Sequence, residues 1–536
     1  MATAQMNNNK GGAEVAPLRA PGGRCHAAAV VKAAGFAAIF LFCTLAYGDV
    51  FVRAQQESYI AADGTVMDFL LSKPCGRLYW AARWLLAAYK NVWIGGLLLS
   101  AILTGVACQA AHILRKVAKP ARPMSESAAV GAAFILPAAI LAAMVAEGTN
   151  LYYKFEPSRI FIWPICCLLG LAAVSAGMAF LSKGGTVASN KGVQSLKAAI
   201  PGLAVVAAVF GTLSFYAVYT RQNVVLTARM QNSLWEQDWQ RMIDDGLAAR
   251  RPTRAVAAYY AVALLQTGQL PDRLFAIPFD YPDSDLEKVD GNEEYGQLLA
   301  DCNFEAGLVL GGYHHALERT VMNGVSVRNL KRLAVAAIML GEDELARKYL
   351  HLISMTPFEG GFIAKYEPML EDRSLISQDG ELRNVEALKP TESRYEQNYR
   401  EPLFMGYNVG LGQGSDAALV PSATACMYAK MLDALMPRLA IMKQKGMAIT
   451  PLMEQAALCY LAGHSGAQLP IAVSDLTKSQ FSSFISDVQP VMKDKERMRE
   501  EMKEKWLGSY FYYYYCENND EKATGVKDKN KSEGVN

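Results

Sequence analysis

VWIGGLLLSAILTGVACQAAHIL, an uncharged stretch at residues 92–114, decides the fold class of this chain. A helix needs about 20 apolar residues to cross the hydrocarbon core of a bilayer. Inside lipid, only helices and closed barrels satisfy their own backbone groups. Four further stretches share this length and composition, with Lys32 as their one charged residue: 27–48, 127–146, 160–182 and 198–220. We therefore expect a bundle of five membrane-spanning helices.

Composition disfavours several classes of function. No acidic or basic side chain lies near the middle of a span, and buried ionisable groups are the usual mark of pumps and ion-coupled transporters. The chain has a formal net charge of only +2 and shows no basic stripe interleaved with aromatics, so we expect no nucleic-acid partner. Its ten cysteines show no Cys-x-x-Cys spacing, which predicts neither a zinc site nor a disulfide framework.

The chain divides where its apolar stretches end. Residues 1–26 are a polar N-terminal segment, and residues 27–220 hold the five spans. Residues 221–516 are long enough for a sizeable folded domain. The charged and Asn-rich residues 517–536 predict a disordered tail.

Positive charges in short loops predict orientation, because such loops are retained in the cytoplasm. The loops after the second and fourth spans carry Arg115, Lys116, Lys119, Arg122, Lys183, Lys191 and Lys197. The loop after the third span carries only Lys154 and Arg159. We therefore expect a bacterial cytoplasmic-membrane protein with a cytoplasmic N-terminus and an external, periplasmic residue range 221–536. The external 49–91 loop opposes this assignment with Arg53, Lys73, Arg77, Arg83 and Lys90.

The 49–91 loop predicts a helix over residues 76–90. Its apolar side chains recur at helical spacing and its aromatic side chains add bulk: Leu78, Tyr79, Trp80, Ala81, Ala82, Trp84, Leu85 and Tyr89. A helix that combines cations and indoles with an apolar stripe favours the membrane interface. A soluble helix that caps the bundle is an equal alternative.

Residues 221–516 predict pairs of helices. The clearest pair covers Asn329–Ile353, where small and large apolar residues alternate at helical spacing on both sides of Leu340-Gly341. Small residues at such contacts are typical of tetratricopeptide repeats. Weaker copies are Ala255–Leu274, Asp238–Ala249 and Met453–Gly463. Since such pairs must stack to bury their apolar faces, we expect an all-α protein in which the bundle precedes a tetratricopeptide-like, solenoid-type soluble domain.

Four segments together resemble a known family. They are Met67–Gly76, the pair from Arg332-Leu333-Ala334 to Tyr349-Leu350, Met453–Leu458 and Gly508–Tyr515. In this order they resemble uncharacterised multi-pass membrane proteins of the Bacteroidetes that are classed as a domain of unknown function. Cys75 and Phe511 depart from the family pattern, which has Gly and a nearby Trp there. The resemblance implies the architecture and no activity.

Asp49 and Glu57 are the candidate catalytic residues. They follow the first span and precede the 76–90 helix. Membrane-embedded glycosyltransferases that use polyprenyl-linked sugars place a carboxylate in their first external loop, where it acts as general base. This analogy between folds gives the alternative hypothesis of a transferase with Asp49 or Glu57 as base.

Three other motifs favour structural interpretations. His314-His315 with His351 lacks a spaced carboxylate or Cys, so we expect no metal. Residues 410–414, Gly-Leu-Gly-Gln-Gly, lack the preceding strand and following Lys of a phosphate loop. The aromatic run Tyr510–Tyr515 predicts a last helix that packs its rings against earlier helices. No motif indicates a cofactor.

The favoured function is therefore non-enzymatic. We expect an envelope scaffold that is embedded in the lipid bilayer and uses its helical domain to bind a protein or peptide partner. The transferase hypothesis remains the alternative.

The orientation can be tested with alkaline phosphatase fusions, since this enzyme is active only outside the cytoplasm. A fusion after Arg229 should be active and a fusion after Lys119 inactive, because the loop that holds Lys119 carries the strongest cytoplasmic signal. The reverse pattern would place residues 221–536 in the cytoplasm.

Overall fold

The computed structural model describes residues 27–61, 64–117, 125–148, 162–181, 196–279, 293–390 and 415–517. Helices dominate these residues, and no β-strand occurs among them. The all-α prediction is therefore confirmed for the described parts of the chain. The polar segment 1–26, the glycine-rich loop 410–414 and residues 518–536 of the predicted tail lie outside these parts.

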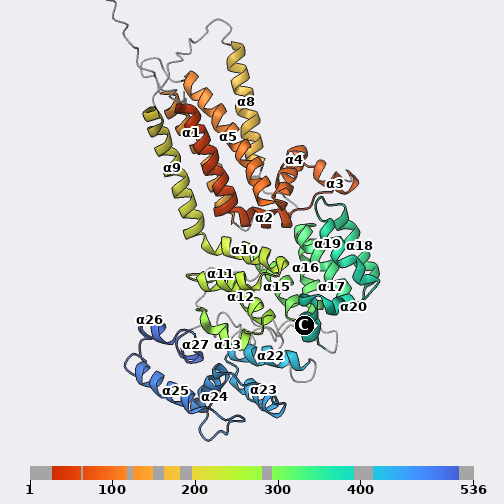
Figure 1. Cartoon of the computed structure of the whole chain (residues 1–536), viewed down its shortest axis with the longest axis vertical. Coiled ribbons are helices and arrows are strands. Elements are labelled where there is room, and N and C mark those ends of the chain that lie inside the picture. Colours follow the sequence, from red (N-terminus) through yellow and green to blue (C-terminus); the bar gives the residue numbers. More distant parts are fainter. Residues whose placement is uncertain are drawn as a thin grey trace, which may run out of the picture.

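Five helical segments are long and apolar enough to cross a membrane, which confirms the prediction from the sequence. In chain order they are α1 (Ala27–Leu41) with the π-helix η1 (Phe42–Ala46), α5 (Val92–Val117), α6 (Glu126–Ala133) with α7 (Ile135–Glu147), α8 (Trp163–Leu181), and η5 (Leu196–Ala199) with α9 (Ile200–Phe215) and the π-helix η6 (Tyr216–Thr220). These segments lie alongside one another as a bundle at one end of the molecule (Figure 1).

Small residues let the helices of the bundle approach closely. A Cβ atom at Gly131 of α6 would lie 2.6 Å from the Cα atom of Gly202 of α9. A Cβ atom at Gly35 of α1 would lie 2.2 Å from the ring of Phe134. Close contact of this kind stabilises helix packing in lipid, where the burial of apolar side chains between helices contributes little free energy.

The 49–91 region lies between the bundle and the helices that follow the fifth span, which we call the polar half (Figure 1). It contains α2 (Gly48–Glu57), α3 (Gly64–Leu71), α4 (Gly76–Ala87) and the 3-10 helix η2 (Ala88–Lys90). The helix predicted at 76–90 is thus formed by α4 and η2. Ala82, Leu85 and Leu86 are buried in the core of the bundle, whereas Trp80 and Trp84 are exposed.

The polar half begins immediately after η6 and consists of two groups of helices. The first group contains α10 (Gln222–Glu236), α11 (Trp239–Ala248), α12 (Arg254–Gln266), α13 (Leu270–Arg273), η7 (Leu274–Ala276), α15 (Glu293–Glu305), α16 (Val309–Asn323), α17 (Val327–Leu340), α18 (Asp343–Ser354), α19 (Gly360–Tyr366), η8 (Glu367–Leu370), α20 (Ser374–Gln378) and α21 (Gly380–Leu388). The second contains α22 (Asp416–Tyr428), α23 (Leu432–Gln444), α24 (Pro451–Gly463), α25 (Asp475–Val488), α26 (Lys495–Trp506) and α27 (Tyr510–Cys516). The second group lies farther from the bundle (Figure 1).

The helices predicted in the polar half are present. The Asn329–Ile353 pair is α17 and α18, and each helix from α15 to α18 packs against the next. Gly341 ends α17 with a positive φ of 81°, a conformation that glycine adopts without strain. Ala334, Ala337 and Ala346 are buried at the contacts within this group.

The aromatic run near the C-terminus forms α27, and its docking is confirmed. Tyr510, Phe511, Tyr512 and Tyr513 are buried in the core that joins the two groups of the polar half. The Tyr510 hydroxyl donates to the carbonyl oxygen of Met427 at 2.9 Å. Buried tyrosines need such partners for their hydroxyls, so the run acts as a packing segment.

Replacement of Ala346 by Arg should disrupt the contact of α18 with α17. Ala346 is 0% exposed, so the substitution forces volume and charge into a packed site, at a cost on the order of 3 kcal/mol. We expect a clear loss of thermal stability in the detergent-solubilised full-length protein. Lys348→Ala, on the exposed face of the same helix, should change stability little. Equally small effects would contradict this packing.

Candidate functional site

The two carboxylates singled out from the sequence lie at opposite ends of α2. This helix is amphipathic: Val50, Phe51 and Ala54 are buried in the bundle core. Its other side packs against α10 and α17 of the polar half. The pattern of residues in α2 therefore places Asp49 and Glu57 at the contact between the membrane bundle and the polar half, which we call the junction.

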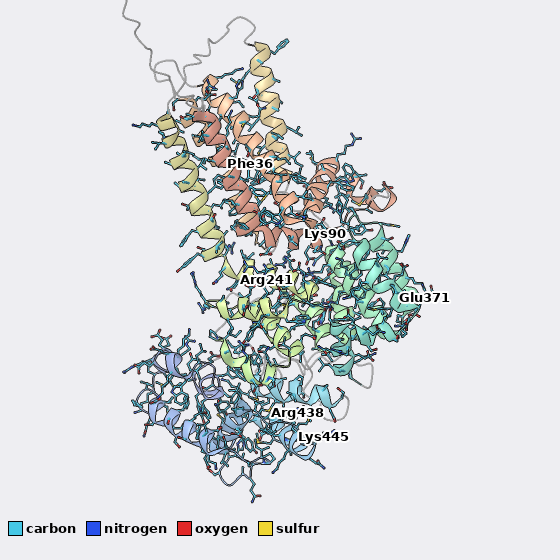
Figure 2. The ribbon with its side chains drawn as sticks, in the orientation of Figure 1. Phe36, Lys90, Arg241, Glu371, Arg438 and Lys445 are labelled. Atoms are coloured by element: carbon cyan, nitrogen blue, oxygen red, sulfur yellow. The ribbon has the colours of Figure 1, made fainter. Side chains whose placement is uncertain are left out.

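Asp49 pairs with arginines of the polar half. The Nε atom of Arg229 in α10 lies 3.0 Å from Asp49 Oδ2, and Arg229 Nη1 lies 2.9 Å from Asp245 Oδ1. Asn232 donates to the backbone oxygen of Asp49 at 3.0 Å. Arg241 is 4.0 Å from Asp49 and lies just below the bundle in Figure 2. Burial raises the pKa of Asp245, against the lowering effect of Arg229.

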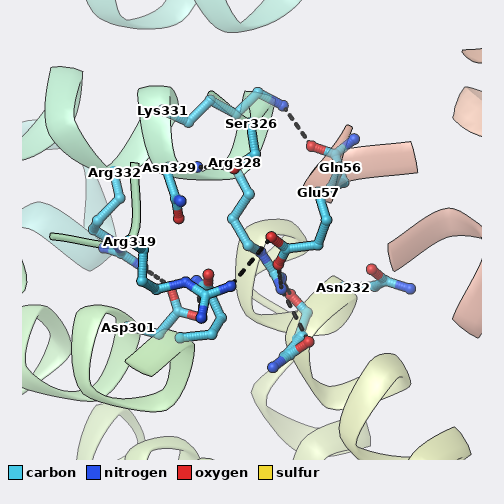
Figure 3. A network of polar contacts seen from close by, with 12 residues as sticks. Gln56, Glu57, Asn232, Asp301, Arg319, Ser326, Arg328, Asn329, Lys331 and Arg332 are labelled. Carbon is cyan, nitrogen blue, oxygen red and sulfur yellow. Dashed lines mark hydrogen bonds and ion pairs between the residues drawn. The ribbon is translucent and has the colours of Figure 1, made fainter. Parts of the chain in front are cut away.

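Glu57 is buried between two arginines (Figure 3). Its carboxylate lies 3.6 Å from Arg319 of α16 and 3.7 Å from Arg328 of α17. Arg328 also donates to the side chain and the backbone oxygen of Gln231, at 3.0 and 2.6 Å. The side chain of Glu57 is 2% exposed and that of Arg328 is 0% exposed. Such a pair is stable only when both charges keep their partners.

A further carboxylate, the buried Glu359, receives one cation from each side of the junction. Lys90 of η2 and Lys331 of α17 both place Nζ 2.7 Å from its carboxylate oxygens. Burial lowers the pKa of Lys331 to about 8, against the raising effect of Glu359. Two hydrogen bonds add to this contact: Val327 N–H donates to the Ser58 oxygen at 3.1 Å, and the Tyr59 hydroxyl donates to the Leu352 oxygen at 3.1 Å.

The charged network continues into the polar half. Arg332 Nη2 lies 3.3 Å from both Asp301 Oδ1 and Glu305 Oε1, and all three side chains are 0% exposed. Burial raises the pKa of Glu305 well above its usual range, the nearby Glu381 carboxylate adds to this effect, and Arg332 opposes it. Burial and the Glu381 carboxylate therefore oppose ionisation of Glu305, whereas its ion pair with Arg332 favours ionisation.

The surroundings of Asp49 and Glu57 indicate that both carboxylates have structural roles at the junction. A general base must lie within hydrogen-bond reach of the proton that it abstracts, so the acceptor needs access to it. Glu57 faces two guanidinium groups in a buried setting, and Asp49 faces Arg229. The two carboxylates also belong to separate ion-pair clusters, so α2 does not bring them together as an acid and base pair.

Among the described residues, a cluster of possible metal ligands occurs on α16, and it includes the carboxylate of Glu318, which was overlooked in the sequence. The ligand atoms of His314, His315 and Glu318 lie within 4.8 Å of one another, whereas His351 is not part of this group. His315 Nδ1 lies 3.4 Å from Glu318 Oε2, and burial lowers the pKa of His315. All three residues come from consecutive turns of one helix. Because metal centres draw on a fuller ligand set, we assign no metal to this cluster.

The described residues include an apolar pocket in the polar half. It has a volume of about 370 Å³ and lies between α12, α13, α21 and α22. Gln266 and Asn384 supply polar groups to its wall, and Asn384 donates to Gln266 at 2.9 Å. Gln266 in turn donates to Glu305 at 3.0 Å. The pocket is thus linked by hydrogen bonds to the buried carboxylate cluster.

Comparison with known proteins gives a family and no activity. A family described as a family of unknown function (DUF6057) matches residues 24–177 and 146–517. The chain belongs to this family. Its match covers the spans, the junction and the polar half, and confirms the resemblance to a family of unknown function. No curated protein and no solved structure matches the chain.

The partners of Asp49 and Glu57 were not predicted from the sequence, in which the 49–91 loop and residues 221–516 stand far apart. A signal was nonetheless present in α17, where Arg328, Lys331 and Arg332 stand at i, i+3 and i+4 without an acidic residue in the helix. Like charges at this spacing repel one another. They therefore require carboxylates from other elements, and Glu57, Glu359, Asp301 and Glu305 supply these.

Removal of the Glu57 charge should destabilise the junction. Glu57→Gln takes the carboxylate away from Arg319 and Arg328, and loss of one partner from a buried ion pair costs about 3–5 kcal/mol. We expect a lower thermal unfolding temperature and faster proteolysis between the bundle and the polar half. Glu371→Gln removes an exposed partner of Arg347 and should change stability little, because water and salt screen exposed ion pairs. Similar melting curves for both variants would contradict a structural role for Glu57.

Proposed function

We propose that the chain is a scaffold of the bacterial cell envelope, whose polar half binds a protein or peptide partner outside the cytoplasm. The observation that carries this proposal is the junction. Ion pairs of Glu57 and Glu359 fix the polar half against the bundle. The second group of helices lies away from the bundle (Figure 1), where a partner could reach it.

The proposed location is the cytoplasmic membrane, with the N-terminus in the cytoplasm. The 49–91 region and the polar half lie at the same end of the bundle (Figure 1), as five crossings require. Cations of the 49–91 loop weigh against this orientation in a simple count of loop charges. Two of them have structural partners: Lys90 pairs with Glu359 across the junction, and Arg83 donates to the Tyr59 oxygen within the 49–91 region. Their presence thus has a structural cause that is separate from topology.

We also propose that α15–α18 form a tetratricopeptide-like stack. Consecutive helices pack against each other in this region. The contacts use small residues: a Cβ atom at Gly312 would lie 2.8 Å from the Phe304 Cβ atom and 3.0 Å from the Ala300 oxygen. Helical stacks of this kind offer extended surfaces for peptides.

The pocket between α12 and α22 is the proposed contact site for the partner. Its wall is mainly apolar, with Gln266 and Asn384 as polar groups. Pockets of this composition bind apolar groups and orient them through a few hydrogen bonds. An apolar side chain of a peptide could fill the pocket while the peptide backbone bonds to Asn384.

The transferase alternative has less support. It requires Asp49 or Glu57 as a base toward an acceptor hydroxyl on a polyprenyl-linked sugar substrate. Both side chains form ion pairs with the polar half, and no specific observation places a substrate beside them.

The scaffold proposal can be tested by site-specific photo-crosslinking in cells. A photoreactive residue in place of Ala417, which lines the pocket and is exposed, should give one discrete protein adduct. The same residue in place of Lys478 on α25 should not give it. Ala387→Trp, which fills the pocket from α21, should abolish the adduct and leave the protein abundant in the membrane. An adduct that forms equally from both positions, or that survives Ala387→Trp, would overturn the proposed contact site.

A further inference from the structure

A groove runs along the bundle between the first and fifth spans. It has a volume of about 440 Å³ and is lined by α1 and η1 on one side and by α9 on the other: Ala38, Leu41, Phe42, Leu45, Ala46, Val206, Ala207, Phe210, Gly211 and Ser214. All these residues except Ser214 are apolar. Both walls belong to segments of membrane-spanning length.

The groove opens on the outer surface of the bundle, which faces hydrocarbon in a membrane-spanning protein. Leu41 and Leu45 are 51% and 61% exposed. Apart from the adjacent residues and the backbone of its own helix, no described atom lies within 4 Å of the position that a Cβ atom at Gly211 would take. An apolar hollow at this depth excludes water, so it suits an acyl chain, which is the apolar chain that the bilayer itself supplies.

The groove lies in the half of the bundle nearest the polar half of the chain. Ala46 and Ser214 mark this end of its lining, and the two spans end at Ala46 and Thr220. Just beyond, Tyr219 of η6 is 51% exposed and stacks on Phe215, with ring centroids 4.7 Å apart. Exposed aromatic side chains at the end of a span are typical of the headgroup level.

An arginine of the polar half lies at this level. The guanidinium carbon of Arg250 is 3.6 Å from the centre of the Tyr219 ring. Gln222 and Asn223 of α10 hold the chain here, because Gln222 donates to the Ala248 oxygen at 3.2 Å and Asn223 donates to the Arg251 oxygen at 2.8 Å. The α11–α12 connection therefore presents a fixed cation beneath the fifth span.

The arginines near this end of the groove have different kinds of partner. Arg229 and Arg241 face Asp49 and Asp245 within the junction. Arg250 instead stacks on an aromatic ring, an arrangement that leaves the edge of a guanidinium able to donate to an anion. Cations next to a membrane surface attract anionic headgroups.

We propose that this groove binds an anionic phospholipid, with one acyl chain between α1 and α9 and the phosphate against Arg250. Binding at this site requires both the apolar groove and Arg250. The apolar walls select a lipid over free phosphate, and the arginine selects an anionic headgroup over a zwitterionic one. This inference is independent of the proposed partner of the polar half.

The test uses delipidated full-length protein in detergent and native mass spectrometry of bound lipid. Phosphatidylglycerol and phosphatidylcholine with the same acyl chains are added in separate titrations. We expect phosphatidylglycerol to bind about fivefold more tightly, the factor expected from one arginine near an anionic surface. Inorganic phosphate should not compete, because it has no chain to occupy the groove.

Two variants separate the parts of the site. Arg250→Gln should lower the affinity for phosphatidylglycerol to that for phosphatidylcholine, whereas Arg347→Gln, on the exposed face of α18, should leave the preference unchanged.

Gly211→Leu should weaken the binding of both lipids, because the leucine side chain occupies the groove. Gly177→Leu is the matched control, since, with the same exceptions, a Cβ atom at Gly177 of α8 also meets no described atom within 4 Å. Thermal melting verifies that each variant is folded. The proposal is overturned if Arg250→Gln retains the preference, if Gly211→Leu binds both lipids like Gly177→Leu, or if inorganic phosphate displaces the lipid.

Discussion

The pairing of Glu57 with Arg319 and Arg328 is the interaction on which the arrangement of the two halves depends. These side chains are almost fully buried, and a buried charge without its partner is strongly unfavourable. The carboxylate therefore fixes where α16 and α17 can lie relative to α2. Because α2 follows the first span directly, the same contact fixes the polar half relative to the membrane bundle. The bonds from Val327 N–H to the Ser58 oxygen and from the Tyr59 hydroxyl to the Leu352 oxygen add direction to this contact.

The junction and the interior of the polar half share one helix. On α17, Arg328 and Lys331 pair with carboxylates at the junction, while Arg332 pairs with Asp301 and Glu305 deeper inside. Burial raises the pKa of Glu305 and thereby favours a proton there. The unfolded chain would bind this proton less tightly, so the stabilising contribution is present at low pH and is lost as the pH rises through the folded pKa. The stability of the fold therefore depends on the balance of charges in its interior.

The sequence predicted what depends on composition and local spacing. Five apolar stretches gave the spans, Leu340-Gly341 gave the turn between α17 and α18, and the Tyr510–Tyr515 run gave a docked last helix. It could not predict which charges meet, because ion pairs such as Glu57 with Arg328 join residues far apart in the chain. Asp49 and Glu57 therefore appeared as free carboxylates of a loop. Their partners become visible only after the helices are placed in three dimensions.

The proposed lipid groove and the junction meet at two π-helices. η1 leads from the groove into α2, and η6 leads from it into α10. Short π-helical turns inside longer helices shift the register of side chains and often occur at functional sites. A lipid between α1 and α9 would therefore contact both segments that enter the junction. Binding stabilises the docked arrangement only to the extent that the lipid has lower affinity for an undocked one. Since the headgroup cation Arg250 belongs to the polar half and the acyl groove to the bundle, separation of the two halves would divide the site, and this division is the physical basis for such a difference.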